Sequence, residues 1–581
     1  MGKRWRIQPH DAACVAELER RVGVPAVVAQ LLASRGIRHA DAARQFLKAP
    51  ASDLYDPDLL PGIPEATKRI LGAIRRGRRI TVYGDYDADG MSATAILVRC
   101  LRLLGADVDV YVPNRLDDGY GLNDDALELI ARRGTSLVVT VDCGIASVEE
   151  AKTARRLGLE LIVTDHHEPQ ADLPDADVLV HPRLPGSRYP FGALCGAGVA
   201  FKLAWSLCRA YCGQERVSGA MRGFLIQSLG LAAIGTIADV VPLLDENRLL
   251  VRHGLTALTD RPPPGLAALM QVTRLANQRQ LTSEDIAFVI GPRLNAAGRL
   301  GEAMLGVELL ATDNEERART LAQHLHEQNE KRDSVERGIY QMAIARLKEL
   351  GDPHEAPALV VDGQGWHPGV IGLVAGRLAE KYHRPTVVIS VDPTGLRPAV
   401  GSARSACGLE LHRALAHCER WLLAHGGHAA AAGLKIDPRY ISDFRKAFCE
   451  VAAAWIAPED RVAELWIDAE APFSQLSEQT VQQIEQLAPF GEGNPRPVLC
   501  TVAVEVNGPL KMLGTSGRHF AVELRQHQQT IRAVAFGKPQ WIEMLGRLQT
   551  SIDVAYSPVL NRFGGRCSVE MQLVDWRPSS V

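Results

Sequence analysis

Residues 83–90 read YGDYDADG and place three carboxylates, those of Asp85, Asp87 and Asp89, within five positions. The residues before them, RRITVY at 78–83, are β-branched and apolar toward their end, which predicts a short strand that stops at the following glycine. Carboxylates crowded at a strand end repel one another, and hard divalent cations hold them together because carboxylate oxygens are their preferred ligands. A metal site is therefore the first hypothesis, and a solvated acidic turn or a calcium-type loop is the alternative.

The same arrangement recurs in two further apolar runs, LVVTV at 137–141 and LELIVT at 159–164. The polar groups that follow them are Asp142, Asp165, His166 and His167. Helical stretches separate the strands, and alternating strands and helices predict a parallel sheet with right-handed crossovers. Such sheets bind ligands at the carboxyl ends of their strands, so we expect these acids and histidines to meet at one edge. Asp239 follows an apolar run in a helix-rich segment, and the sheet argument does not place it.

Carboxylates and imidazoles together suit manganese, or magnesium with an imidazole added. The eleven cysteines contain no CxxC pair, which argues against a structural zinc site. Two divalent ions bridged by shared carboxylates need about this many ligands, and two ions about 4 Å apart clamp the attacking and leaving oxygens in phosphoester hydrolysis. A single histidine is more often structural, but two adjacent histidines at an acidic strand end favour a site.

Four short motifs then occur in a fixed order. They are DYDADG at 85–90, VDCG at 141–144, DHH at 165–167 and GTIAD at 235–239. In this order they resemble the motifs of the DHH phosphoesterase family. The sequence GGH at 426–428 resembles the signature of the DHH-associated domain.

Four other segments are similar to the RecJ branch of that family. They are LNAAGRL at 294–300, WHPGVIG at 366–372, SARS at 402–405 and PFGEGNP at 489–495. The resemblance covers nearly the whole chain. It implies a metal-dependent enzyme, a single-stranded-DNA-specific exonuclease that degrades from the 5′ end, releases mononucleotides and acts in DNA recombination and repair.

The resemblance also implies roles for individual residues. The implied ligands of two divalent ions, Mn or Mg, are Asp87, Asp89, Asp142, His166 and Asp239. His167 would meet the phosphate or protonate the leaving oxygen, and Asp165 would orient an imidazole or only cap its strand. Asp85 would complete the cluster or orient one of the ligands. The implied nucleic-acid-binding residues are Asn295, Arg299, Ser402, Arg404, Ser405, Gly426, Gly427 and His428. Tyr83 and Trp366 could stack on bases, although core packing is the equal alternative.

Composition agrees with a multidomain protein of the cytoplasm. A chain of 581 residues is too long for one core, and 46% hydrophobic with 23% charged residues is ordinary for a soluble globular protein. The N-terminus has no secretory pattern, no apolar run approaches a membrane span, and scattered cysteines indicate reduced thiols. The net charge of −3 is weak evidence about nucleic acid, because acids bound to metal do not repel a phosphate.

The chain divides into five predicted parts, which together give an α/β fold. Residues 1–50 form an N-terminal helical extension, and residues 51–311 form the DHH domain with its parallel sheet. A long polar helix at 312–353 leads to a second α/β domain at 354–458, the DHH-associated domain. Residues 459–581 hold short alternating strands, which predict a small β-barrel of the oligonucleotide-binding type.

Two other functions stay open at this point. A DHH phosphodiesterase for very short RNA or cyclic dinucleotides, or a DHH pyrophosphatase, would be shorter and would lack the C-terminal barrel. A non-catalytic scaffold of related fold would have lost metal ligands, whereas every acid and both histidines are present here. The expected partner is single-stranded DNA, and the resemblance adds a single-strand-binding protein and a RecQ-type helicase as candidate partners of a monomeric chain.

Overall fold

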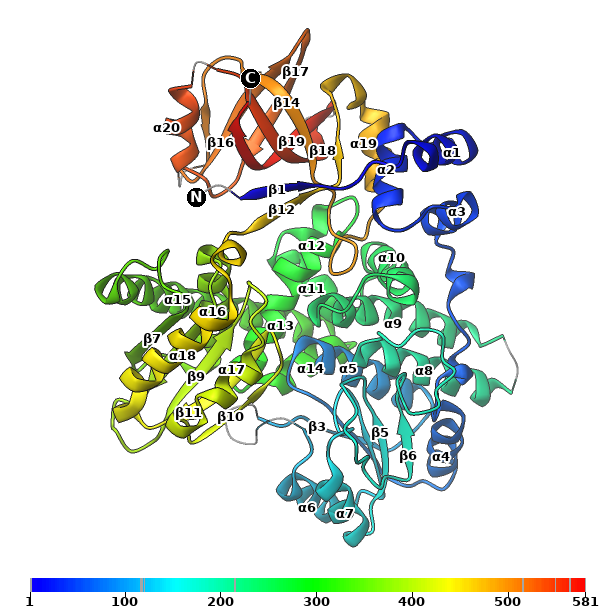
Figure 1. Cartoon of the computed structure of the whole chain (residues 1–581). Helices are drawn as coiled ribbons and strands as arrows, with labels where there is room; N and C mark the ends of the chain where they lie inside the picture. The colour runs from blue at the N-terminus through cyan, green and yellow to red at the C-terminus, as the bar shows by residue number, and fades with distance from the viewer. Residues whose placement is uncertain are drawn as a thin grey trace. The chain divides into compact units, whose positions relative to one another are not determined.

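The computed structural model describes residues 3–114, 119, 121–213, 216–514, 517–548, 550–563 and 566–579 (Figure 1). The chain forms two compact units. The larger unit comprises Leu54–Val241 and Asp245–Ala463, and the smaller unit comprises Met1–Asp53, Pro242–Leu244 and Glu464–Val581. The smaller unit is therefore assembled from three separate stretches of the chain.

The larger unit contains the predicted parallel sheet, with five strands in the order β3-β2-β4-β5-β6. Its strands are β2 (Ile80–Tyr83), β3 (Val108–Tyr111), β4 (Leu137–Thr140), β5 (Glu160–Thr164) and β6 (Val178–Val180). All four neighbouring pairs are parallel. Parallel strands need crossover connections, and most of the connections here are helical. The carboxyl ends of β2, β4 and β5 therefore lie at one edge, as the sequence predicts.

Helices cover this sheet and bury its side chains. They are α4 (Ile63–Arg75), α5 (Ala88–Leu103), α6 (Asp124–Arg132), α7 (Val148–Arg156) and α8 (Gly196–Cys212). Val138, Leu161 and Val163 alternate along β4 and β5 and share a buried cluster with α6 and α7. Helices α5 and α8 pack against each other and contact the sheet. Tyr83 is fully buried in the same cluster as Val138 and its hydroxyl donates to the Gly121 carbonyl at 2.9 Å, so it packs in the core and does not stack on bases.

A helical region follows the sheet. Its helices are α9 (Gly219–Ala238), α10 (Asp245–Asp260), α11 (Pro264–Val272), α13 (Gly291–Arg299) and α14 (Ala303–Ala311). No apolar run of membrane-spanning length is expected from the sequence, yet α9 is long and apolar enough by length and composition. Because 61% of its most apolar window is buried inside the protein, α9 has the character of a core helix.

The predicted long helix is present as α15 (Glu315–Leu350), with 36 residues. The Asn314 side chain accepts hydrogen bonds from the amides of Glu316 and Arg317 and starts the helix, and Gly351 follows its last residue. Its buried residues, among them Leu321, Leu325 and Ile339, occupy one stripe of the helix. The rest of its surface is largely polar, which is typical of a connecting helix.

The second sheet of the larger unit also has five strands, in the order β10-β11-β9-β8-β7. Its strands are β7 (Leu359–Gln364), β8 (Thr386–Val391), β9 (Ala399–Arg404), β10 (Ala424–Gly427) and β11 (Ala431–Ile436). Only the β7–β8 pair is parallel, with α16 (Pro368–Tyr382) between its strands. Helix α16 packs with α15 on one face, where Trp366 is buried in the core, while α17 (Leu411–His417) and α18 (Ile441–Trp455) lie on the other.

The smaller unit contains the predicted barrel, in a seven-stranded sheet with the order β13-β14-β18-β19-β17-β16-β15. Its strands are β13 (Ala469–Glu470), β14 (Leu499–Val506), β15 (Lys511–Leu513), β16 (His519–Gln526), β17 (Gln529–Ala535), β18 (Ile552–Phe563) and β19 (Arg566–Pro578). An additional pairing of β14 with β16 closes the sheet into a ring. Closure removes the edges that an open sheet leaves exposed.

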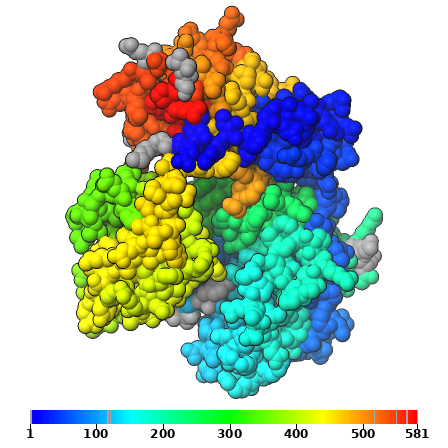
Figure 2. Space-filling view, in the orientation of Figure 1, coloured from blue at the N-terminus to red at the C-terminus, as the bar shows by residue number. Residues whose placement is uncertain are grey.

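The N-terminal residues belong to the same unit as this barrel and include a strand that the sequence does not predict. Strand β1 (Arg4–Ile7) pairs in parallel with β12 (Glu464–Ile467). Helices α1 (Ala12–Val22), α2 (Ala26–Ser34) and α3 (Ala40–Lys48) share one hydrophobic core with α19 (Glu478–Glu485) and the barrel. Figure 2 shows these blue N-terminal residues packed directly against orange and red C-terminal residues. Helices α1–α3 thus belong to the same compact unit as the barrel, and their apolar faces are buried in the core that they share with it.

Candidate active site

The first acidic motif wraps the start of α5. Asp87 caps the helix, and its Oδ1 accepts hydrogen bonds from the amides of Asp89 at 2.9 Å and Gly90 at 3.0 Å. Asp85 is 2% exposed, and a Cβ on Gly90 would lie 2.6 Å from the Asp85 Cβ. Glycine at position 90 therefore lets the acidic loop fold back over the helix start.

Helix α8 holds the third acid of this motif from the other side. The Asp89 carboxylate accepts hydrogen bonds from the backbone amides of Gly196 at 2.7 Å and Ala197 at 2.9 Å. These amides open α8, whose positive end favours a carboxylate. A Cβ on Gly196 would lie 2.4 Å from Asp142 Oδ1, and a Cβ on Gly235 would lie 2.1 Å from Asp89 Oδ1. Glycine at both positions is what lets α8 and α9 reach the acids.

Gly196 and Ala197 are functional positions that the sequence reasoning missed. The signal that could have found them is the glycine-rich stretch CGAG at 195–198, which stands before an apolar helical run. A helix that begins with small residues offers unobstructed amides to an anion. The periodicity of the sequence, however, does not show which carboxylate those amides will bind.

His166 lies at the centre of the acidic cluster. Its Nε2 atom is 3.1 Å from Asp142 Oδ1, 3.6 Å from Asp239 Oδ2 and 3.8 Å from Asp89 Oδ2. The same atom is buried and has no hydrogen-bond partner among the residues that the structure describes. A buried imidazole nitrogen that faces three carboxylates without a hydrogen bond matches the environment of a metal ligand.

Three overlapping groups of side chains bring potential ligand atoms within 4.8 Å of one another. They are Asp142 with His166 and His167, Asp89 with His166 and Asp239, and Asp85 with Asp87 and Asp142. The four motifs contain eight acids and histidines, and the structure brings all of them except Asp165 into these groups. Asp239, which caps the end of α9, is one of the residues brought in. Asp142 and His166 are shared between groups, and shared ligands are what a pair of bridged ions requires.

Asp165 makes the bonds of a strand-end cap and of an imidazole-orienting group at once. Its Oδ2 accepts from the Ile145 amide at 2.9 Å, and its Oδ1 accepts from the His166 amide at 2.7 Å. The same Oδ1 lies 2.7 Å from His167 Nδ1. This contact fixes the orientation of the His167 ring through its Nδ1 atom.

Burial and mutual repulsion set the charges of the cluster. Burial and the neighbouring carboxylates raise the pKa of Asp142 well above 3.8, and the same two causes raise the pKa of Asp239 to about 8. Burial lowers the pKa of His166 to about 4, which keeps the imidazole neutral and able to bind a metal. Burial also opposes charge on His167, but the hydrogen bond and charge of Asp165 outweigh it and raise that pKa to about 9. The cluster thus lacks positive charge at its centre, and the chemistry of its donors fits divalent cations.

These shifts predict how the metal-free protein responds to pH. A carboxyl whose folded pKa is raised, as that of Asp239 is from 3.8 to about 8, stabilises the fold below pH 3.8 and loses that contribution as pH rises through 8. His167, raised from 6.5 to about 9, acts in the same direction over its own range. We expect the Tm in chelator to fall between pH 5 and pH 9.

The measurement is a series of thermal melts in chelator and in Mn²⁺. Asp239→Asn, which cannot ionise, should flatten the fall, and saturating Mn²⁺ should also flatten it. A Tm in chelator that is constant over this range, with wild-type and variant alike, would contradict the assigned charges.

The implied nucleic-acid-binding residues on α13 make contacts within the protein. Asn295 Oδ1 accepts a hydrogen bond from the amide of Ala88, at the start of α5. Arg299 Nη1 donates to the Gly369 carbonyl at 3.1 Å, at the start of α16. These bonds join α13 to the acidic loop and to the second sheet, so both residues help to position the site whatever else they bind.

The implied residues of the second sheet divide into two places. Arg404 Nη1 donates to Ser402 Oγ at 3.1 Å and to the Ala403 carbonyl at 2.7 Å, on β9. A Cβ on Gly372 of α16 would lie 3.0 Å from Ser402 Oγ and 3.1 Å from Arg404 Nη2, so glycine keeps room for both groups. The other four implied residues of this sheet lie outside the Ser402–Arg404 contact. Ser405 directly follows β9, Gly426 and Gly427 end the exposed strand β10, and His428 begins the turn that leads to β11.

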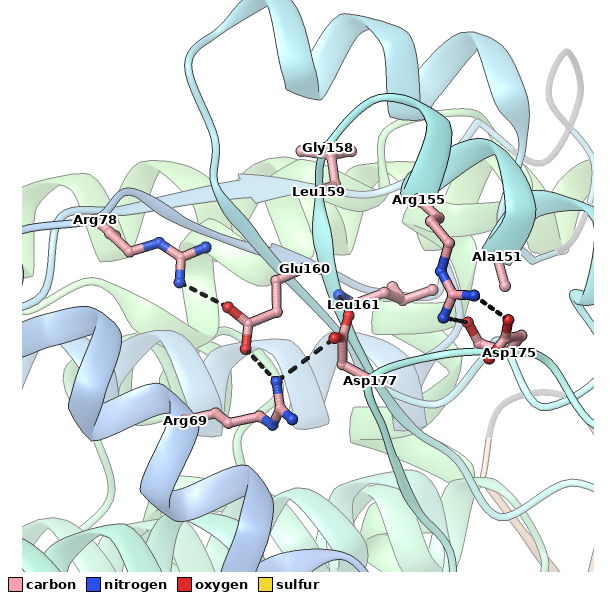
Figure 3. Close-up of a pocket in the computed structure, with 10 residues that line it drawn as sticks. All are labelled: Arg69, Arg78, Ala151, Arg155, Gly158, Leu159, Glu160, Leu161, Asp175 and Asp177. Carbon is pink, nitrogen blue, oxygen red and sulfur yellow. Dashed lines mark hydrogen bonds and ion pairs between the residues drawn. The ribbon is translucent and has the colours of Figure 1, made fainter.

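One polar pocket of about 360 Å³ lies away from the acidic cluster (Figure 3). Glu160 binds Arg69 at 3.0 Å and Arg78 at 2.6 Å, and Arg155 binds Asp175. Glu160 begins β5, whereas Asp165 follows its other end, so the pocket lies at the amino ends of the strands. Three arginines and three acids neutralise one another there, and the pocket contributes nothing to the metal site.

Comparison with known proteins agrees with this geometry. Three family models match the chain: the DHH family N-terminal domain at residues 79–236, the DHHA1 domain at 355–454 and the RecJ OB domain at 467–575. The single-stranded-DNA-specific exonuclease RecJ of Bacillus subtilis is 37% identical over 577 residues, covering 99% of this chain and 69% of that protein. The RecJ of Dickeya dadantii is 34% identical over 574 residues, covering 96% of each chain.

Solved structures extend the likeness to the metal site. The crystal structure of RecJ from Thermus thermophilus in complex with Mn²⁺ is 32% identical, covers 100% of this chain and 80% of that chain, and has a TM-score of 0.83. The Mg²⁺ complex of RecJ from the same organism is 31% identical, covers 100% and 79%, and has a TM-score of 0.77. These two structures are complexes with Mn²⁺ and with Mg²⁺, the kinds of ion that the mixed acid and imidazole donors predict. The chain belongs to the RecJ single-stranded-DNA-specific exonucleases of the DHH family, as the order of its motifs predicts.

Proposed function

We propose that this chain hydrolyses single-stranded DNA from the 5′ end and releases mononucleotides, with two Mn²⁺ or Mg²⁺ ions, in DNA recombination and repair. The observation that carries the proposal is the set of three carboxylates within 3.8 Å of the buried His166 Nε2. A scaffold without catalysis has no reason to keep such a costly group of buried charges. An enzyme for very short nucleotides has no evident use for the C-terminal barrel.

The activity is tested with one oligonucleotide labelled at either end, in Mn²⁺, in Mg²⁺ and in chelator. We expect the 5′ label to leave at once as a mononucleotide, the 3′-labelled strand to shorten gradually, and chelator to stop both. A blunt duplex of the same sequence should be cut far more slowly, because opening each base-pair step costs about 1.4 kcal/mol. Immediate release of the 3′ label, or equal rates on duplex and single strand, would contradict the proposal.

The residues of the cluster divide into proposed roles. Asp87, Asp89, Asp142, His166 and Asp239 would hold the ions, and Asp85 would complete their surroundings. Divalent ions in such a site polarise the phosphate and lower the pKa of water. The chain itself keeps His166 neutral, aims Asp89 through the amides of α8, and excludes water from the buried acids.

His167 is the proposed proton donor. Its ring is 41% exposed, so it can reach a substrate that the buried His166 cannot. With a pKa of about 9 it carries a proton at neutral pH, and Asp165 fixes its Nδ1. Its Nε2 can then donate to a phosphate oxygen or to the leaving oxygen.

Arg404 is proposed to bind a phosphate together with Ser402 and Ser405. Arg404→Ala should weaken single-strand binding and reduce the salt dependence of the binding constant, because each lost phosphate contact lowers the slope by about 0.7 for single strands. Binding is measured by fluorescence anisotropy in Ca²⁺ or chelator across a salt series. Arg439→Ala is the matched control, since that arginine is 80% exposed, is paired with Asp437 and lies outside the motifs. Equal slopes for Arg404→Ala and wild type would remove Arg404 from the substrate path.

The remaining implied residues are also proposed to bind the single strand. The Arg299 guanidinium would bind phosphate from α13, with Asn295 holding the start of α5. Gly426, Gly427 and His428 would let the exposed turn approach a nucleotide. Gly427 has φ of +135°, and a Cβ there would lie 2.5 Å from the Ala431 carbonyl, so only glycine keeps this turn.

The barrel is proposed to hold the strand beyond the cleavage site. Phe536 at the end of β17 is 53% exposed and contacts the His519 ring at 5.4 Å between centroids, which offers a stacking surface. Stacking of one base is worth about 1–3 kcal/mol. Phe536→Ala should therefore weaken binding of long strands and leave strands of a few nucleotides unchanged.

The comparison needs a length series at fixed salt, with Met544→Ala as the control of similar exposure in the same unit. Equal losses for short and long strands would make the barrel a folding support only. Point substitutions are needed here because deletion of residues 459–581 would also expose the core of the N-terminal helices.

Partners and location follow the same family reasoning. A single-strand-binding protein and a RecQ-type helicase are proposed to act with this chain, which would work as a monomer in the cytoplasm.

A further inference from the structure

The segment after Asp239 passes from one compact unit to the other and back. Pro242–Leu244 belong to the smaller unit, whereas the residues on either side belong to the larger one. Within the smaller unit, Leu243 is 2% exposed and its amide donates to the Glu492 carbonyl at 2.8 Å. Glu492 lies in the segment PFGEGNP at 489–495, for which the proposed chemistry has no role.

Residues 489–495 are here called the 489–495 loop. Two glycines of this loop leave room for Pro242–Leu244. A Cβ on Gly491 would lie 2.7 Å from Leu243 Cδ1. A Cβ on Gly493 would lie 3.2 Å from both Leu244 Cδ1 and Pro242 Cβ, and Gly493 has φ of +70°. A side chain at position 491 would force the Leu243 side chain to move, and one at position 493 would press on Pro242 and Leu244 and strain the backbone.

The 489–495 loop is itself fixed from within. Asn494 is fully buried, and its Nδ2 donates to the carbonyls of Leu487 at 2.9 Å and Pro489 at 2.8 Å. Its Oδ1 accepts from Arg35 Nε at 2.8 Å, and its carbonyl accepts from the Gly491 amide at 2.9 Å. A buried amide with all these partners gives the loop one conformation.

Only Val240 and Val241 separate the held segment from Asp239. Val240 has φ of +59° and Asp245, on the far side, has φ of +44°. Non-glycine residues persist in this region of φ only where the surrounding structure determines the backbone. At the other end of the connection, Asp239 Oδ2 lies 3.6 Å from His166 Nε2.

We propose that the 489–495 loop is a positioning element for Asp239. By holding Pro242–Leu244 it fixes the backbone that begins three residues beyond Asp239 and so keeps that carboxylate in the metal cluster. The inference rests on the proposed function, because it takes Asp239 as a ligand.

The test is a titration of the full-length metal-free protein with Mn²⁺, in which calorimetry measures the binding. Leu243→Ala removes the side chain that the 489–495 loop holds. Gly491→Ala keeps Leu243 but adds a methyl group against it. Both should weaken binding of one ion about tenfold, as loss of groups that support a ligand does. Leu243→Met should restore the affinity. Leu524→Ala is the control, since it removes an equally buried leucine from the barrel core of the same unit and should leave Mn²⁺ affinity unchanged.

Asp239→Asn completes the set, and melts verify that each variant is folded. Weaker Mn²⁺ binding by Asp239→Asn, with wild-type binding by Leu243→Ala and Gly491→Ala, overturns the positioning role alone. Equal losses in Leu243→Ala and Leu524→Ala overturn it too, because general destabilisation then explains both. Unchanged binding by Asp239→Asn instead refutes the ligand assignment in the proposed function.

Discussion

Asp142→Asn is expected to reduce the rate of hydrolysis by at least about 10³-fold, equivalent to about 4 kcal/mol at the transition state. Asp142 belongs to two of the three groups of close ligand atoms, so its loss affects both proposed ion positions. Asparagine is the better substitution here because Asp142 has φ of +64°, a region that asparagine adopts more readily than alanine.

The same substitution should raise the Tm in chelator. Burial and the neighbouring acids raise the pKa of Asp142, so its charge opposes folding once pH exceeds the unfolded value of 3.8. An asparagine removes that cost. A variant that is inactive yet more stable without metal would separate a ligand from a structural residue.

The control is Asp553→Asn, an acid that is 4% exposed and bonded to Ser579 Oγ at 2.8 Å within the smaller unit. It should lower stability and leave hydrolysis by the folded protein unchanged. Activity of folded Asp142→Asn close to that of wild type, at saturating Mn²⁺, would refute the two-ion assignment.

Deletion of residues 1–50 is expected to unfold the C-terminal barrel. Leu18, Val28, Leu31 and Leu32 are fully buried in the core shared with the barrel. At about 1.5–3 kcal/mol for each buried side chain, their loss is comparable to the 5–15 kcal/mol that stabilises a typical domain. We expect rapid proteolysis within residues 464–581 and loss of one thermal transition.

Deletion of residues 1–8 is the matched control, because it removes β1, whose side chains are mostly exposed, and leaves α1–α3 in place. This shorter deletion should cost far less stability. Resistance of the barrel to proteolysis after the longer deletion would mean that residues 464–581 fold without the N-terminal helices.

The sequence alone determines most elements of the fold and the acids and histidines of the site. Strand ends at Asp85, Asp142 and Asp165 are visible because an apolar run and the polar residues that follow it are local properties of the sequence. A parallel sheet then follows from alternating strands and helices, and it brings these residues to one edge without further information. The order of the motifs indicates the family, and the family indicates that the site binds divalent ions.

Only the tertiary structure decides which distant segments meet. It brings Asp239 from the end of α9 to His166, and it turns the amides of Gly196 and Ala197 toward Asp89. It joins residues 1–53 to the barrel, and it buries Tyr83, which the sequence leaves as either a stacking or a core group. The reason is physical: periodicity shows that a face must be buried but not which surface buries it, since any apolar partner satisfies the hydrophobic effect equally. The choice of partner is made by shape and by hydrogen bonds between residues far apart in the chain, and these exist only once the chain has folded.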